Sequence, residues 1–270
     1  MTSRITIAEA CRDILLTAGP LDKVRAARAA SRAWRQGKLV HAFNVKMPAR
    51  PARPPLPELL PASQMPKRGK GGSQRGRIAM LHALANIEFA AIDLAFDLAG
   101  RFGASFPADF VSDWVSVGAD EAIHFLMLDR RLRALGSFYG ALPAHDGLWE
   151  AAEATAHDPL ARLAVVPMVL EARGLDVTPA TVERLEAAGD QRSAAILSRI
   201  YRDEIRHVGA GTKWFRIGCE AQRIEPVSHW QRLVGLHFRG LVKPPFNDSA
   251  RLEAGLSRDF YDGVAAARYV

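Results

Sequence analysis

Residues 121–124 read Glu-Ala-Ile-His and residues 204–207 read Glu-Ile-Arg-His, and each string lies inside a long stretch of helical periodicity. A helix places residues three apart on the same face, so the glutamate and the histidine of each string project together. Apolar residues occupy the same face in both stretches, and burying an unpaired carboxylate among them would be costly. We therefore interpret the two strings as halves of one buried polar site.

A single core-facing glutamate precedes each of these pairs. Glu88 lies within HALANIEFAAIDLAFDLAGRF (residues 82–102), and Glu171 opens EARGLD (residues 171–176). The order along the chain is thus Glu, Glu-x-x-His, Glu, Glu-x-x-His, with 33 residues separating the glutamates in each half. This spacing predicts two related halves.

Four carboxylates in one core repel each other, and two cations would remove that cost by coordination. We expect Glu121 and Glu204 to bridge the ions and each ion to take one further glutamate and one histidine. The six predicted ligands are Glu88, Glu121, His124, Glu171, Glu204 and His207. A carboxylate-rich site with one imidazole per ion suits two irons, an iron–manganese pair or two manganese ions better than a structural zinc.

Three further residues are candidates near this site. Asp120 and Asp203 directly precede the two Glu-x-x-His strings. Metal-bound histidines commonly donate their second N–H to a carboxylate, so we predict crosswise pairs, Asp203 with His124 and Asp120 with His207. Tyr201, one turn before Glu204, either lines the substrate side or is a buried tyrosine with a satisfied hydroxyl.

The periodicity from residue 77 to about 220 is helical nearly throughout and predicts an all-α fold. We expect a four-helix bundle at 77–220, and weaker signals predict a helical tail at 221–270 packed on it. The four helices are expected at about 75–102, 107–135, 158–173 (with Gly174 as its C-cap signal) and 190–219, with a short helix at 178–188.

The N-terminal segment, residues 1–76, is predicted to hold short basic helices followed by a Pro-rich connector. Seven prolines between residues 47 and 66 exclude a helix there. Residues 1–77 hold 16 Lys/Arg against 4 Asp/Glu, a balance of +12, whereas the remainder carries −5. Either this segment recruits an anionic partner such as RNA, or it wraps the helices and pairs with their acidic groups.

Composition narrows the class of protein. The 270 residues are 49% hydrophobic and 24% charged, which is ordinary for a soluble globular chain. Two cysteines, far apart in sequence, argue against a disulfide framework and against a cysteine-based zinc site. The absence of a signal-peptide pattern favours a cytoplasmic protein with no membrane partner.

Residues 78–220 resemble the ferritin-like di-iron carboxylate proteins. The strings HALANIEFAAIDLAFDLAGRF, DEAIHF, YGALPAHDGLWEAA, EARGLD and DEIRHV also resemble the domain of unknown function 455 family, over most of the chain. DEIRHV in addition is similar to the Asp-Glu-x-Arg-His string of di-iron oxygenases. The resemblance implies a ferritin-like bundle with a di-metal site, but no substrate.

Three kinds of function fit a di-metal carboxylate bundle. We favour a dioxygen-activating oxidoreductase, a hydroxylase or oxygenase, because the segments on either side of the bundle can shape a pocket for a small-molecule substrate. Iron oxidation or storage and peroxide removal form one alternative, and a scaffold with structural metal forms another. The basic N-terminal segment would also suit a tRNA-modifying hydroxylase. No nucleotide-binding fingerprint is present, so a catalytic reaction would need an external electron donor.

Overall fold

The computed structural model describes residues 4–66 and 73–266, and within these ranges it is helical, with no β-strand. The chain forms two compact units, the first ending at Trp149 and the second beginning at Glu150. A short helix, α5 (Gly147–Ala154), contains this boundary. The all-α class expected from the periodicity is confirmed for the described residues.

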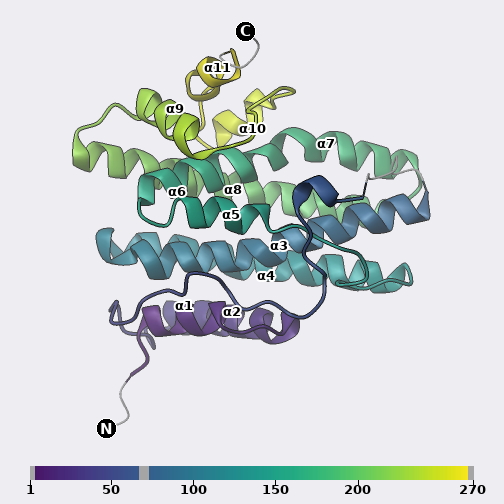
Figure 1. Ribbon diagram of the computed structural model, residues 1–270, viewed down its shortest axis with the longest axis horizontal. Helices are drawn as coiled ribbons and strands as arrows, with labels where there is room; N and C mark the ends of the chain where they lie inside the picture. The colour runs from purple at the N-terminus through teal and green to yellow at the C-terminus, as the bar shows by residue number, and fades with distance from the viewer. Residues whose placement is uncertain (1–3, 67–72, 267–270) are drawn as a thin grey trace. The chain divides into compact units, whose positions relative to one another are not determined.

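The first unit is built on a helical hairpin of α3 (Gln74–Phe102) and α4 (Ala108–Ala134) (Figure 1). Only residues 103–107 connect the two helices, which makes them antiparallel neighbours. Gly118 permits their close approach, because a Cβ there would lie 2.6 Å from the ring of Phe96. Two shorter helices complete the unit: α1 (Ile7–Leu15) packs on α3, and α2 (Pro20–Arg35) packs on α4.

The beginning of α1 shows how closely local signals can specify a helix end. The Thr6 side chain accepts a hydrogen bond from the Glu9 amide, and the Glu9 carboxylate accepts one from the Thr6 amide. This capping box, for which the Thr-x-x-Glu spacing is typical, satisfies two backbone donors that the first turn would otherwise leave unpaired.

The Pro-rich connector lies along the first unit. Its backbone is tied at Ala52, whose amide donates to Leu15 O, and at Leu60, whose amide donates to Ala144 O (both 2.8 Å). Arg101 donates to the carbonyl of Pro48 at 2.8 Å, and Arg50 pairs with Asp146. These contacts match the wrapping interpretation of this segment for the described residues; residues 67–72, also part of the basic segment, lie outside them.

A buried ion cluster joins three parts of the first unit. Asp93 of α3 is fully buried and accepts from Lys23 of α2, which is also fully buried, and from Arg53 of the connector at 2.8 Å. Burial lowers the pKa of Lys23 and raises that of Asp93, each opposed by the attraction of its partner. The cluster therefore holds α2 and the connector on α3 at the cost of desolvating both charges.

The second unit is built on a pair of long helical segments. The first consists of α6 (Pro159–Val165), a π-helical turn (Val166–Glu171) and α7 (Ala172–Ala187); the second is α8 (Gln191–Gln222). The C-terminal helices are α9 (Pro226–His237), α10 (Asp248–Glu253) and α11 (Arg258–Ala266). Among them, α9 packs on α6, and α10 packs on α7 and α8. The tail from residue 221 thus packs on the helices of its own unit.

The sequence prediction for residues 158–188 is wrong in its boundaries. The helix does not end at Gly174 but continues to Ala187, with Pro179 inside it. A proline at this position cannot donate to the carbonyl four residues earlier, and in most helices that carbonyl would be left without its partner. Here the side-chain amide of Asn247 donates to Leu175 O at 3.2 Å and replaces the missing donor.

One helix of the described residues, α3 with the turn that follows it (residues 74–105), has the length and apolar character of a membrane span. However, 61% of its most apolar 18-residue stretch is buried inside the protein. This is the behaviour expected of a core helix in a soluble protein.

The buried ion cluster generates the first prediction. Replacing Asp93 by Asn leaves Lys23 buried without its counter-charge, and we expect a loss of about 3–5 kcal/mol in the free energy of unfolding. Urea denaturation measures this loss. The control is Asp13→Asn, which removes an exposed pair with Arg12 and should cost less than about 1 kcal/mol. Equal losses in the two variants would show that the cluster does not hold the unit together.

Candidate metal centre

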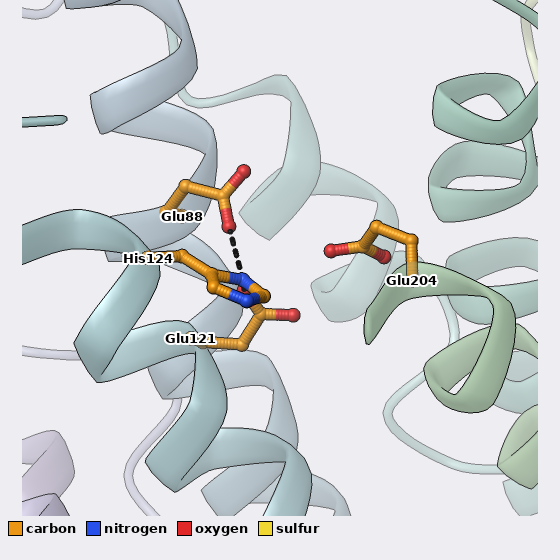
Figure 2. A group of neighbouring side chains, drawn as sticks. All are labelled: Glu88, Glu121, His124 and Glu204. Atoms are coloured by element: carbon orange, nitrogen blue, oxygen red, sulfur yellow. Dashed lines mark hydrogen bonds and ion pairs between the residues drawn. The ribbon is translucent and has the colours of Figure 1, made fainter. Parts of the chain in front are cut away.

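The first unit brings three of the predicted ligands together. Glu121 and His124 lie one turn apart on α4, and Glu88 faces them from α3. The Nδ1 atom of His124 lies 3.1 Å from a carboxylate oxygen of Glu121 and 3.2 Å from one of Glu88. Figure 2 shows both carboxylates converging on the imidazole ring. Glu204, also drawn there, comes from α8 of the second unit.

The three side chains are deeply buried. Glu121 and His124 are each 1% exposed and Glu88 is 4% exposed. Burial raises the pKa of Glu88 well above its ordinary value, and the nearby Glu121 charge raises it further. Burial alone would lower the pKa of His124, but its hydrogen bonds to Glu121 and Glu88 outweigh this and raise the pKa to about 11. The cluster thus retains a proton on the imidazole at neutral pH to compensate its carboxylates.

This cluster could hold a metal ion. One ligand atom from each of Glu88, Glu121 and His124 lies within 4.8 Å of the others. Two carboxylates and one imidazole form a donor set that first-row transition metals accept readily. A divalent cation would also supply the positive charge that the protonated His124 now provides, so the residues present fit a metal.

An aromatic cluster joins α3 and α4 at the residues that follow Glu88 and His124 in sequence. Phe89 follows Glu88 and Phe125 follows His124, and their rings pack with centroids 5.2 Å apart. Tyr139 packs against both rings, at 5.4 and 5.0 Å, and its hydroxyl donates to Asn86 at 3.1 Å. Burial raises the pKa of Tyr139. Sequence reasoning missed this aromatic support because Tyr139 lies in a loop, where no periodicity marks it.

The second unit holds the other three predicted ligands. Glu204 and His207 lie one turn apart on α8, with Glu204 Oε1 and His207 Nδ1 3.5 Å apart. Both are buried, at 9% and 1% exposure. Glu171 is half-buried and closes the π-helical turn, a type of distortion that is frequent at functional sites. Gly211 allows α8 to approach this turn, because a Cβ there would lie 2.5 Å from Pro167.

Two of the three remaining candidates, Asp203 and Tyr201, contact neighbours in their own unit. The Asp203 carboxylate accepts from Arg199 at 2.6 Å and from Arg206 at 2.5 Å, both on α8. The Tyr201 hydroxyl accepts from the Asn247 side chain at 3.1 Å. Asp120 lies half-buried on α4. The crosswise pairs of the two aspartates with the histidines, and a place for Tyr201 on the substrate side, stay predictions.

The electrostatics of the first-unit cluster generate a second prediction. With a pKa of about 11, His124 is protonated at pH 7, whereas coordination requires a neutral ring nitrogen. Binding of Mn²⁺ at pH 7 should therefore release at least about one proton per chain, and the affinity should fall as the pH falls. Calorimetric titration in two buffers of different ionisation enthalpy measures the number released.

His124→Gln is the matched control for this titration, because it removes the proton donor while leaving both carboxylates. We expect it to release fewer protons and to bind the ion more weakly. Binding to the wild-type chain without proton release would contradict the assignment of His124 as a ligand.

Comparison with known proteins identifies the family of the chain and gives no function. The chain is 38% identical over 219 residues to an uncharacterised protein of Haemophilus influenzae (strain ATCC 51907 / DSM 11121 / KW20 / Rd), covering 79% of this chain and 76% of that protein. No solved structure matches the chain significantly. Residues 16–262 match the family described as "Protein of unknown function (DUF455)", and the chain belongs to this family.

Proposed function

We propose that the protein is a di-metal carboxylate protein whose ligands come from both units. The observation that carries this proposal is the buried first-unit cluster, in which two carboxylates face one imidazole nitrogen at 3.1–3.2 Å. A protein interior accommodates such a concentration of negative charge best when a cation compensates it.

The second half of the ligand set is inferred from the internal repeat. Glu171, Glu204 and His207 repeat the spacing of Glu88, Glu121 and His124 along the chain. They also lie on a pair of neighbouring long helical segments, as the first three do. The ferritin-like di-metal bundles are built in this way, with a glutamate from each of two helices and a Glu-x-x-His motif from each of the other two. We therefore propose that the two helix pairs form one four-helix bundle around two metal ions.

The proposed ions are two irons, or iron and manganese, and the proposed reaction class is dioxygen activation. Such a pair would supply redox chemistry that no amino-acid side chain can provide. The chain would contribute binding, through its carboxylates and imidazoles, and exclusion of water, through the deep burial of Glu88, Glu121 and His124. Electrons would come from an external donor, and the substrate would be a small organic molecule.

Anoxic loading with Fe²⁺, followed by exposure to oxygen, tests this proposal. We expect two irons per chain in the wild-type protein and oxygen uptake that continues only while a reductant is supplied. Iron is measured by elemental analysis and oxygen by an electrode. Accumulation of hundreds of irons per assembly would support storage instead, and a folded protein that binds no metal would contradict the whole assignment.

Two variants separate ligands from neighbours in the same experiment. Glu204→Ala removes a proposed bridging ligand and should reduce metal content to below about one ion per chain. Tyr201→Phe keeps the ring and loses only the hydroxyl that Asn247 contacts, so it should retain two. Two ions in the Glu204→Ala protein would exclude the bridging role.

A further inference from the structure

A groove of about 550 Å³ lies in the first unit between α2 and α4, and its walls are strongly basic. Five arginine side chains line it, all of them exposed: Arg25, Arg28 and Arg32 from α2, and Arg130 and Arg133 from α4. The apolar residues Leu21, Val24 and Leu126 also line it. None of the six proposed metal ligands lines this groove.

Acidic groups of the protein neutralise little of this charge. Among the described residues, the one acidic side chain that lines the groove is that of Asp129, which is buried and accepts from Arg133 at 2.8 Å and from the Tyr139 amide at 3.2 Å. Arg25 pairs with the exposed Asp22 at the groove's edge. Within residues 4–66 and 73–266, Arg28, Arg32 and Arg130 have no carboxylate partner.

Several other basic residues of the N-terminal segment differ from the groove arginines, because they pair with carboxylates inside the first unit. In the N-terminal segment, Lys23 and Arg53 pair with Asp93, and Arg50 pairs with Asp146, so these charges serve the packing of the first unit. The α2 arginines do not take part in that packing. They recur about once per helical turn, which spaces them by roughly 5 Å along the helix. Packing against the first unit thus explains part of the positive charge of the basic segment. The arginines of α2 remain as a row of guanidinium groups that face water.

We propose that this groove binds the phosphodiester backbone of a double-stranded nucleic acid. An exposed arginine is screened by solvent and contributes little to binding alone, so a surface of this kind gains affinity only from many contacts at once. A polyanion provides them, because each phosphate neutralised releases counterions. In the part of the chain that the structure describes, no aromatic side chain lines the groove to stack on unpaired bases, which favours a duplex over a single strand.

The proposal does not rest on the metal site, and its test needs no metal. The full-length protein is titrated against a fluorescent 20-base-pair RNA duplex and against a DNA duplex of matching sequence, by anisotropy at 50 and 200 mM KCl. We expect both duplexes to bind with similar affinity, because the phosphates carry the interaction, and both to be weakened steeply by salt. Failure of the wild-type protein to bind either duplex at 50 mM KCl would overturn the proposal.

Charge-matched variants locate the surface. The triple variant Arg28→Gln, Arg32→Gln, Arg130→Gln should weaken binding at least about ten-fold at 50 mM KCl and lower the log–log salt slope by about 3. The corresponding lysine triple keeps the charge and should retain most of the affinity. As a control, Arg192→Gln, Arg239→Gln, Lys243→Gln removes the same charge from exposed positions of the second unit and should change the affinity by less than about two-fold. Equal losses in the two glutamine triples would show that net charge, not the groove, carries the binding.

Discussion

Compensation of buried negative charge is the constraint on which this structure depends. Helix α3 carries fully or nearly buried carboxylates toward two different sides, Asp93 toward α2 and the connector, and Glu88 toward α4. The first is compensated by Lys23 and Arg53, two cations that the chain itself supplies. The second shares a single imidazole with Glu121. Lys23 and Arg53 thus compensate the carboxylate on the α2 side of α3. On the α4 side, two carboxylates and one imidazole form a donor set that suits an exchangeable metal cation.

Sequence patterns predicted much of this arrangement because the relevant signals are local. The ends of α3 and α4 follow helical periodicity interrupted by Gly103 and Pro107, and the pairing of Glu121 with His124 follows from their spacing on one helix. The meeting of Glu88 with this pair was also predictable, since a core-facing carboxylate needs a buried partner. These features require only the helical period and the cost of burying charge.

Other features were not predictable because they depend on distant partners. The continuation of α7 through Gly174 and Pro179 relies on Asn247, which lies 72 residues beyond the carbonyl that it satisfies. Lys23 belongs to the basic N-terminal segment by sequence, yet it is buried against Asp93, 70 residues away. The π-helical turn at Glu171 likewise has no signature in the periodicity. For α7 and for Lys23, a tertiary contact overrides the local signal.

We propose that Glu88, Glu121 and His124 form one half of a two-metal site and that Glu171, Glu204 and His207 form the other half. Crystals of protein loaded with Fe²⁺ under anoxic conditions would test it most directly, by anomalous diffraction recorded on both sides of the iron absorption edge. The expected result is two anomalous peaks per chain, about 3.5–4 Å apart, one beside Glu88 and His124 and the other beside Glu171 and His207, with Glu121 and Glu204 between them. Iron peaks confined to other residues, or none in protein that retains the iron, would contradict the assignment.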